Sequence, residues 1–374
     1  MEGALGESKS NAMRDVLLIG PYPPPYGGPG VHMMHLRRAL EAEGARCVVL
    51  SIWASGGADL PDVLRARSGA EYCMTVLKYF RKGFHVHHLF NVESWKAIAL
   101  AALAAILARM TNGSYSIGFI GGPAQRYLDR SSILWGQPLR MTLKSAEFII
   151  CNNELVLSAL TRRGAPVSRV HPIPAFHAEQ VAEIGVLEPE CEEFVTVHDP
   201  VLCAIVHPRF ETGLPHHEMN LLIQALNILS SGFSRVGCVV MGGAGSVSEY
   251  AQAVETAGLA DHFHFTGELS HRDCLAVMRA SSVFVRAYLR DGTSSSVREA
   301  LALGTPAVAS RNPQHPPSAE QFEPNDASSL AATVKEVVNR SPGLRRELRD
   351  SGEVLQTGLG GELALFRRSP APRS

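Results

Sequence analysis

The chain has 374 residues, a length at which a single hydrophobic core usually gives way to two domains of about 150 to 200 residues. Hydrophobic residues make up 45% of the sequence, which is enough to fill both cores. A formal net charge of -1 and a pI near 7.0 exclude an overall basic field, so we expect no nucleic-acid partner.

Cysteine usage and the first residues bear on the compartment. The seven cysteines are odd in number and include no CxxC pair of the kind typical of zinc and redox sites. Residues 1–12 are small and polar, unlike a signal peptide, and the longest apolar run, 97–108, is too short to span a bilayer. We therefore expect a cytoplasmic protein with a disordered N-terminal extension over 1–12.

The first half of the chain alternates strand and helix patterns. Residues 16–20 form a continuous apolar run typical of a buried parallel strand. A Pro/Gly segment leads to a helix pattern over 32–44 and a strand pattern over 46–52, so the chain opens with a β-α-β unit. Further strand patterns follow at 115–120, 147–151 and 170–174.

The second half repeats this alternation. Strand patterns occur at 201–206, 236–241, 262–266, 283–287 and 307–309, and helix patterns at 217–230, 247–257, 271–280 and 296–303. We predict an α/β protein with two Rossmann-like, doubly wound domains that face each other across a cleft, with ligands at the carboxyl ends of the strands. The predicted division is an acceptor-side domain (13–176), an acidic linker (177–200), a nucleotide-binding domain (201–340), and a C-terminal helix and tail (341–374).

The most informative stretch is 290–310. Asp291 follows a strand pattern, a short Gly/Ser turn comes next, and Glu299 stands eight positions later inside a helix pattern. Free backbone N–H groups at Ser294, Ser295 and Ser296, together with the positive end of the helix dipole, would form a site for a diphosphate without any metal.

This stretch resembles the retaining glycosyltransferases of the group 1 or family 4 type, which have two Rossmann-like domains in the GT-B arrangement. Their signature is two acidic residues separated by seven others, followed by Glu-Ala-x-x-x-Gly-x-Pro, and Asp291, Glu299-Ala300, Gly304 and Pro306 match it. The resemblance implies that Asp291 contacts the transferred sugar and that Glu299 holds the ribose hydroxyls of a UDP- or GDP-sugar. Asp291 is shorter than the glutamate usual in the family.

Other segments match the same family in the same order. Gly27 and Gly28 lie in a glycine loop after the first strand, where the absence of a Cβ lets the backbone approach the donor phosphates and sugar. Gly243 follows a later strand, and the turn at Thr266 commonly lies beside the nucleobase in such enzymes. Arg209 stands where the family keeps an arginine for the diphosphate, which guanidinium geometry suits.

Two positions depart from the family pattern. His217 stands where a phosphate-binding lysine is expected, and two solvent-exposed turn histidines are the alternative interpretation of this segment. Ile120 replaces an acceptor-side histidine, so the sequence leaves the acceptor unassigned.

Two clusters have plainer interpretations. The close spacing of His85, His87 and His88 suggests a metal site, but no carboxylate or cysteine lies at ligand spacing around them. The preferred interpretation is a strand end in the cleft wall, with no metal. The arginine-rich segment after residue 339 predicts a solvated helix, with a weak membrane-surface or acceptor contact as the alternative.

Together these features predict a metal-independent hexosyltransferase that needs no cofactor besides its UDP- or GDP-sugar and acts with retention in polysaccharide or glycoconjugate biosynthesis. The acceptor would be a saccharide or a lipid-linked molecule. The predicted location is the cytoplasm, including peripheral association with the inner face of a membrane. The alternative is a catalytically inert relative that binds nucleotide sugar or a partner enzyme. An NAD-dependent oxidoreductase is disfavoured because Met33 stands where the third glycine of its fingerprint belongs.

Overall fold

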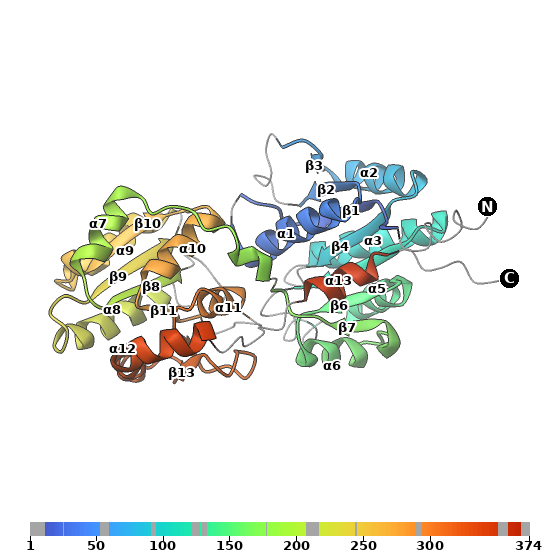
Figure 1. Ribbon diagram of the computed structural model, residues 1–374. Helices are drawn as coiled ribbons and strands as arrows, with labels where there is room; N and C mark the ends of the chain where they lie inside the picture. Colours follow the sequence, from blue (N-terminus) through green and yellow to red (C-terminus); the bar gives the residue numbers. More distant parts are fainter. Residues whose placement is uncertain are drawn as a thin grey trace, which may run out of the picture. The chain divides into compact units, whose positions relative to one another are not determined.

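The protein forms two compact α/β units in a computed structural model (Figure 1). The first unit comes from residues within 1–177 and 356–374, and the second from residues within 178–355. The structure describes residues 12–24, 26–52, 60–90, 95–120, 128, 133–176, 178–206, 217–243, 245–288, 294–350 and 358–367.

The first unit is built on a parallel sheet of seven strands in the order β3-β2-β1-β4-β5-β6-β7. The order reverses direction between β1 and β4, as it does in Rossmann folds. The strands are β1 (Val16–Gly20), β2 (Cys47–Ser51), β3 (Val63–Arg65), β4 (His85–Phe90), β5 (Tyr115–Phe119), β6 (Ile149–Cys151) and β7 (Val170–Pro172).

Helices cover both faces of this sheet. One core joins the sheet to α2 (Gly69–Arg81), α3 (Trp95–Thr111), α5 (Ile133–Ser145) and α6 (Glu154–Arg162). The other joins it to α1 (Gly28–Ala42) and α13 (Leu359–Leu365). A short 3₁₀ helix, η1, spans Val167–Arg169. Because both faces are covered, β1 is buried at every position, as its uninterrupted apolar run predicts.

Helix α1 begins four residues before the predicted start at residue 32. Gly27 is its N-cap residue, Gly28 is its first residue, and Pro29 lies in its first turn. Proline is favoured there because the first helical N–H groups have no partner within the helix. Apolar periodicity begins only at Met33, so the pattern alone placed the start too late.

The second unit contains a parallel sheet of six strands in the order β10-β9-β8-β11-β12-β13, the same order as in the first unit with one strand fewer. Its strands are β8 (Val201–Val206), β9 (Gly237–Gly242), β10 (Phe263–Gly267), β11 (Val283–Arg286), β12 (Ala307–Ser310) and β13 (Glu320–Phe322). Its helices are η2 (Ala178–Val181), α7 (Pro189–Val197), α8 (His217–Ser230), α9 (Val247–Thr256), η3 (Ala260–His262), α10 (His271–Ala280), α11 (Ser295–Ala302) and α12 (Ala327–Asp350). The predicted fold class, α/β with two Rossmann-like units, is confirmed.

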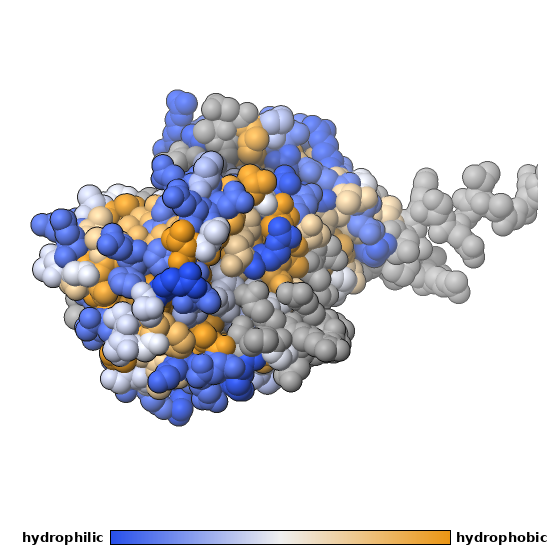
Figure 2. Space-filling view, turned by 60° about the vertical axis from the view of Figure 1, so that its left-hand side comes forward, coloured by the Kyte–Doolittle hydropathy of each residue, from blue (hydrophilic) through white to orange (hydrophobic). Residues whose placement is uncertain are grey.

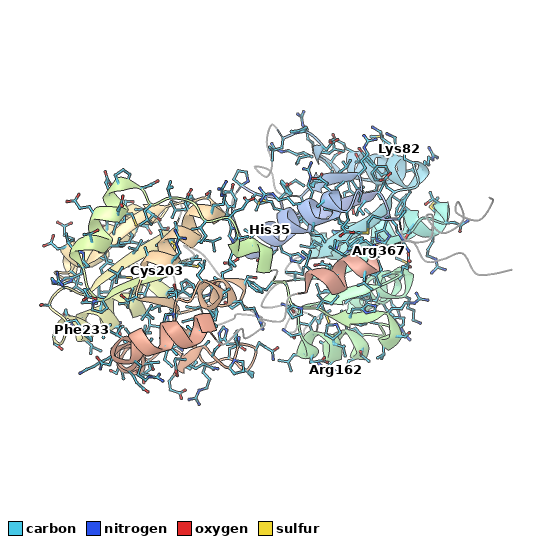
Figure 3. All side chains as sticks on the ribbon, in the orientation of Figure 1. His35, Lys82, Arg162, Cys203, Phe233 and Arg367 are labelled. Atoms are coloured by element: carbon cyan, nitrogen blue, oxygen red, sulfur yellow. The ribbon has the colours of Figure 1, made fainter. Side chains whose placement is uncertain are left out.

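The surface and the interior of this second unit differ in composition. On the side that Figure 2 brings forward, hydrophobic patches alternate with hydrophilic ones. Inside, Cys203 lies fully buried in β8 (Figure 3). All seven cysteines of the chain are free, and five of them are buried.

Two segments outside the predicted domains belong to the compact units. The expected linker contains α7, which packs against β9 and β10 and buries Cys191. The expected C-terminal tail divides, because α12 continues to Asp350 in the second unit whereas residues 358–367 belong to the first. There Phe366 is fully buried, and Arg367 forms an ion pair with Glu43 at 3.0 Å (Figure 3).

Among the described helices, none combines the length and the hydropathy that a membrane span needs. The apolar run at 97–108 lies in α3, whose Ala101, Ala104 and Ala105 are buried while Leu103 and Ile106 are partly exposed. Its apolar character therefore serves packing against the sheet on one side only.

The three histidines expected at a strand end lie instead in the interior of the first unit. His85, His87 and His88 belong to β4, which pairs with β1 and β5 at the centre of the sheet, and each is at most 1% exposed. The prediction that they line a strand end was wrong because three histidines interrupt the apolar pattern by which a buried strand is recognised.

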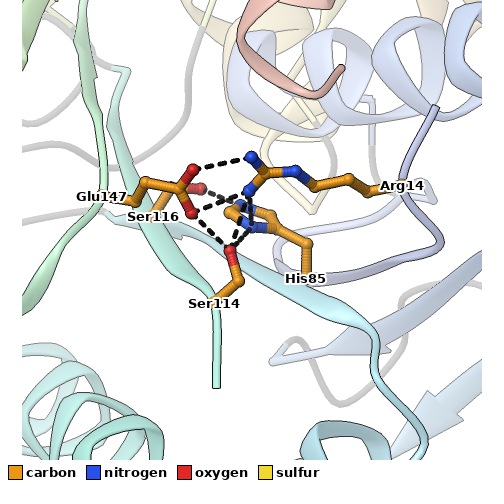
Figure 4. A network of polar contacts seen from close by, with 5 residues as sticks. All are labelled: Arg14, His85, Ser114, Ser116 and Glu147. Atoms are coloured by element: carbon orange, nitrogen blue, oxygen red, sulfur yellow. Dashed lines mark hydrogen bonds and ion pairs between the residues drawn. The ribbon is translucent and has the colours of Figure 1, made fainter. Parts of the chain in front are cut away.

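Serine hydroxyls lie within hydrogen-bond distance of both ring nitrogens of His85 and of one ring nitrogen of His87. Ser116 Oγ lies 2.6 Å from His85 Nε2 (Figure 4). It also lies 2.8 Å from His87 Nδ1. Ser114 Oγ lies 2.6 Å from His85 Nδ1 and donates to Glu147, which forms a bidentate ion pair with Arg14. Burial lowers the pKa of His85 and His88 to about 3 and that of His87 to about 4, so all three imidazoles are neutral at physiological pH.

Candidate functional site

Most of the predicted donor residues that the structure describes lie where strands of the second sheet end. His217 is the first residue of α8, which follows β8, and Gly243 directly follows β9. Thr266 is the next-to-last residue of β10, and Ser294 directly precedes α11, which follows β11. The strands are parallel, so their carboxyl ends meet at one edge of the sheet. The order reverses between β8 and β11, which places the starts of α8 and α11 on either side of the switch point.

Two predicted residues, Arg209 and Asp291, lie outside the described residues. In the sequence, Arg209 follows β8 and Asp291 precedes α11. The structure gives no geometry for either side chain.

A glycine turn ends β9. Gly242 and Gly243 have φ of +85° and +79°, a conformation that favours glycine. A Cβ on Gly243 would lie 2.9 Å from Cε2 of Tyr250, so the turn is packed closely against α9. Glycine is required here by the turn and its packing, whether or not a ligand approaches.

The start of α11 presents backbone N–H groups. Ser294, the N-cap residue, has φ +40°, and its side chain makes no capping hydrogen bond. The Ser294 carbonyl accepts from the N–H of Arg298 at 3.3 Å, and Ser294 Oγ lies 3.5 Å from Ser296 Oγ. The N–H groups of the first turn precede the first intrahelical bond, so the positive end of α11 suits an anion.

Glu299 is held by a histidine from the neighbouring helix. Its carboxylate is buried, with 6% of the side chain exposed, and its Oε1 lies 3.0 Å from Nε2 of His271 in α10. The same carboxylate lies near Cys274, whose pKa is raised to about 12 by burial and, secondarily, by the negative charge of Glu299. The Cys274 thiol is therefore protonated and takes no part as a nucleophile.

His217 and Thr266 differ in how their polar atoms are satisfied. His217 is half-buried, and its Nε2 is buried with no hydrogen-bond partner in the described part of the chain. The hydroxyl of Thr266 donates to the carbonyls of Gly267 and Val240 at 3.1 and 3.4 Å. The alternative of solvent-exposed turn histidines does not fit His217.

The first unit holds the glycine pair predicted to contact the donor. Gly28 begins α1, and a Cβ built on it would meet nothing within 4 Å. The space beside this backbone is open, unlike that beside Gly243. Ile120 directly follows β5 and is buried in the core with α1, as an apolar residue should be.

Sequence reasoning missed two residues at the second sheet. His271 was predicted only as the first residue of a helix, and nothing in the sequence near it points to Glu299, which lies 28 positions later. Arg286 ends β11 with 7% exposure, and its guanidinium lies 4.9 Å from the centroid of the Tyr288 ring. The available signal in the sequence was an arginine at the end of an otherwise apolar strand pattern.

Within the described ranges, no group of three or more histidine, cysteine or acidic side chains is arranged to hold a metal ion. His85 and His87 of β4 lie among serine hydroxyls and the rings of Phe148 and Phe366.

The comparisons with known proteins agree with this architecture. Residues 212–354 match the family model described as glycosyl transferases group 1, which covers much of the second unit and spans the region from α8 to α12. The chain thus has the GT-B fold, and within its second unit residues 212–354 are similar to the group 1 glycosyl transferases.

Solved structures extend the likeness to nearly the whole chain, at identities that show the fold alone. HepE from Anabaena in complex with UDP has a TM-score of 0.67 at 14% identity, with 94% of this chain and 98% of that chain covered. Sucrose-phosphate synthase from Thermosynechococcus elongatus has a TM-score of 0.67 at 16% identity, covering 94% and 97%. A putative UDP-N-acetylglucosamine 2-epimerase from Listeria monocytogenes has a TM-score of 0.61 at 13% identity, covering 94% of each chain. A search of curated proteins gave no match.

Proposed function

We propose that the protein is a glycosyltransferase that moves a sugar from a UDP- or GDP-sugar to an acceptor hydroxyl with retention of configuration, and that it needs no metal. The observation that carries this proposal is the start of α11, where the positive end of the helix lies about one turn from the buried carboxylate of Glu299, on the sheet edge that binds ligands in Rossmann folds. The group 1 family match over 212–354 supports it, and so does the UDP bound to HepE.

Each group has a defined role in this proposal. The N–H groups of Ser295 and Ser296, with Arg209, would bind the diphosphate, and Glu299 would hold the ribose hydroxyls. The bond between the sugar C1 and the diphosphate oxygen breaks, the acceptor oxygen bonds to C1, and the acceptor proton passes to the leaving diphosphate. Asp291 would stabilise the positive charge that develops at C1.

A neutral imidazole at position 217 would bind diphosphate less strongly than an ammonium group. A diphosphate oxygen is the kind of acceptor that the buried Nε2 lacks among the described residues, so we propose that His217 donates to it. The second candidate function, an inert relative that binds nucleotide sugar without transferring it, is favoured by this same substitution.

The acceptor is proposed to be a saccharide or a lipid-linked molecule, with weak peripheral attachment at a membrane. Helix α3 lies between α2 and α5, and the three helices contain one acidic residue, Glu71. Their exposed basic residues are Lys78, Arg81, Lys96, Arg109, Arg140 and Lys144, and their exposed large apolar residues are Met74, Leu103, Ile106 and Met110. Such a mixture suits an anionic lipid surface, where each basic residue contributes about 1 kcal/mol.

The deciding experiment is a thermal-shift screen of UDP- and GDP-sugars followed by product analysis. A donor at 100 times its Kd stabilises the folded protein by about 2.7 kcal/mol, which gives a measurable rise in Tm. Transfer to a supplied acceptor with the donor's anomeric configuration, observed by NMR in the presence of EDTA, is the expected result. Binding without turnover would favour the inert relative, and release of an epimerised nucleotide sugar would overturn the transferase assignment.

Vesicle flotation tests the membrane contact separately. We expect binding to vesicles rich in phosphatidylglycerol, weaker binding at high salt, and loss of binding in the variant Arg109→Glu. Equal binding to neutral and anionic vesicles would contradict the role of the basic residues.

A further inference from the structure

We infer that His271 is a positioning residue that fixes the carboxylate of Glu299 in the orientation a nucleotide ribose would meet. This inference rests on the proposed function and adds to it a residue from a different helix. Three features support it: the buried contact between the two side chains, the restriction that this contact places on the Glu299 side chain, and the contacts that fix the first turn of α10.

The contact joins two side chains that solvent scarcely reaches. Exposure is 9% for the His271 side chain and 6% for that of Glu299, and the Nε2 to Oε1 distance is 3.0 Å. An imidazole N–H donates to a carboxylate whether or not the ring is protonated, so the bond is available in both states. With Oε1 bound to His271, the second oxygen of Glu299 has no hydrogen-bond partner among the described residues, and a hydroxyl of a ligand could donate to it.

Such a bond restricts a flexible side chain. Glutamate has three rotatable torsions, and fixing one carboxylate oxygen selects a single orientation before any ligand arrives. A ligand that meets a pre-oriented carboxylate avoids part of the ordering cost of binding. His271 would therefore act on affinity for the nucleotide while touching none of it.

The backbone of His271 is itself fixed. It is the first residue of α10, and Ser270 caps this helix: its Oγ accepts from the Asp273 N–H at 3.3 Å and donates to the Asp273 carboxylate at 2.6 Å. Asp273 also accepts from the Val186 N–H at 3.3 Å, while the Gly185 N–H donates to the Arg272 carbonyl at 2.8 Å. The segment before α7 thus braces the turn from which His271 reaches Glu299.

Isothermal titration calorimetry with UDP and with GDP tests the inference through a double-mutant cycle of His271→Phe and Glu299→Ala. Phenylalanine keeps a ring of similar size and removes the donor, and we expect it to weaken nucleotide binding by about 10- to 100-fold. If His271 acts through Glu299, His271→Phe has no further effect on the Kd once Glu299 is alanine. Glutamine at 271 restores a donor, so His271→Gln should recover most of the affinity.

Ser270→Ala serves as the matched control, because it removes one of the contacts that fix this turn, while the Val186 and Gly185 contacts to α10 and the His271 to Glu299 pair remain. We expect Ser270→Ala to lower the urea midpoint as much as His271→Phe does while changing the nucleotide Kd less than threefold. Additive effects in the cycle, or equal losses of affinity in His271→Phe and Ser270→Ala, would overturn the positioning role. His271→Gln, which keeps a polar side chain, maintains the test if His271→Phe does not fold.

Different outcomes test the proposed function and the role of His271. If neither nucleotide binds the wild-type protein, or if Glu299→Ala binds it normally, the proposed function is wrong. If Glu299→Ala loses binding and His271→Phe does not, only the inference about His271 is wrong.

Discussion

Acid should unfold the first unit through the buried histidines of β4. Their pKa values are lowered by burial to about 3 for His85 and His88 and about 4 for His87, against about 6.5 in an unfolded chain. Below pH 6.5 the unfolded chain therefore binds protons that the folded unit excludes. The stabilisation is complete above pH 6.5 and declines as the pH falls towards the folded pKa values.

The magnitude follows from the size of these shifts. Between pH 6.5 and 5.5 each histidine with a folded pKa well below 5.5 removes about 1 kcal/mol from the free energy of unfolding, so three remove about 3 kcal/mol. With a typical urea dependence of about 1 to 3 kcal/mol/M, the urea midpoint should fall by about 1 to 3 M over this pH unit. That is a large fraction of the about 5 to 15 kcal/mol by which domains are usually stable.

Tryptophan fluorescence isolates the relevant unit. The three tryptophans of the chain, Trp53, Trp95 and Trp135, all fall in the part of the sequence assigned to the first unit. The control variant is His87→Asn, whose side chain does not titrate and keeps a polar group near Ser116. Between pH 6.5 and 5.5 the free energy of unfolding of His87→Asn should fall by only about 2 kcal/mol, whatever the stability of this variant at neutral pH.

A urea midpoint that stays constant or rises as the pH falls from 6.5 to 5.5 would refute this reasoning. An unchanged pH dependence in His87→Asn would show that His87 is not among the groups responsible.

Three further substitutions have defined outcomes. Phe366→Ala should cost about 3 to 5 kcal/mol in tryptophan-detected urea unfolding, because the ring is fully buried against Phe148 at a centroid distance of 5.3 Å; a cost below 1 kcal/mol would show that the C-terminal segment does not stabilise the first unit. Gly185→Ala should cost about 1 to 3 kcal/mol by circular dichroism, because its Cβ would lie 2.1 Å from Oδ1 of Asp273; a neutral effect would mean that this turn shifts freely. Gly28→Ala should leave the urea midpoint unchanged, because the added Cβ would meet nothing within 4 Å. It should lower the transfer rate at least tenfold if the donor or the acceptor approaches this backbone. An unchanged transfer rate would show that Gly28 is not part of the site.

Much of the second unit could be predicted from the sequence because its signals are local. The predicted spans of β8, α8 and α10 coincide with the observed ones, since each combines an apolar run or helical periodicity with flanking polar or turn residues. Strand alternation also gave the parallel sheets and the sheet edge at which Glu299, Ser294 and Gly243 lie. The spacing around Glu299 gave its place in a helix, which α11 confirms.

Local signals failed where side chains far apart in the sequence decide the structure. β4 was not recognised because its histidines look polar, and only the contacts of Ser116 in the neighbouring strand β5 explain how His85 and His87 can be buried. The last residues look like a charged tail, yet Glu362 is fully buried with its Oε1 3.1 Å from Nε2 of His32, a residue 330 positions earlier.

The sequence by itself therefore determined many of the strands and helices, because apolar periodicity is a property of neighbouring residues. Only the tertiary structure decided the partners of the polar side chains, because a buried imidazole or carboxylate must find a hydrogen-bonding group wherever the fold brings one close. His271 and Glu299 meet in this way: each lies in a helix that the sequence predicts, and their contact exists only once α10 and α11 pack side by side.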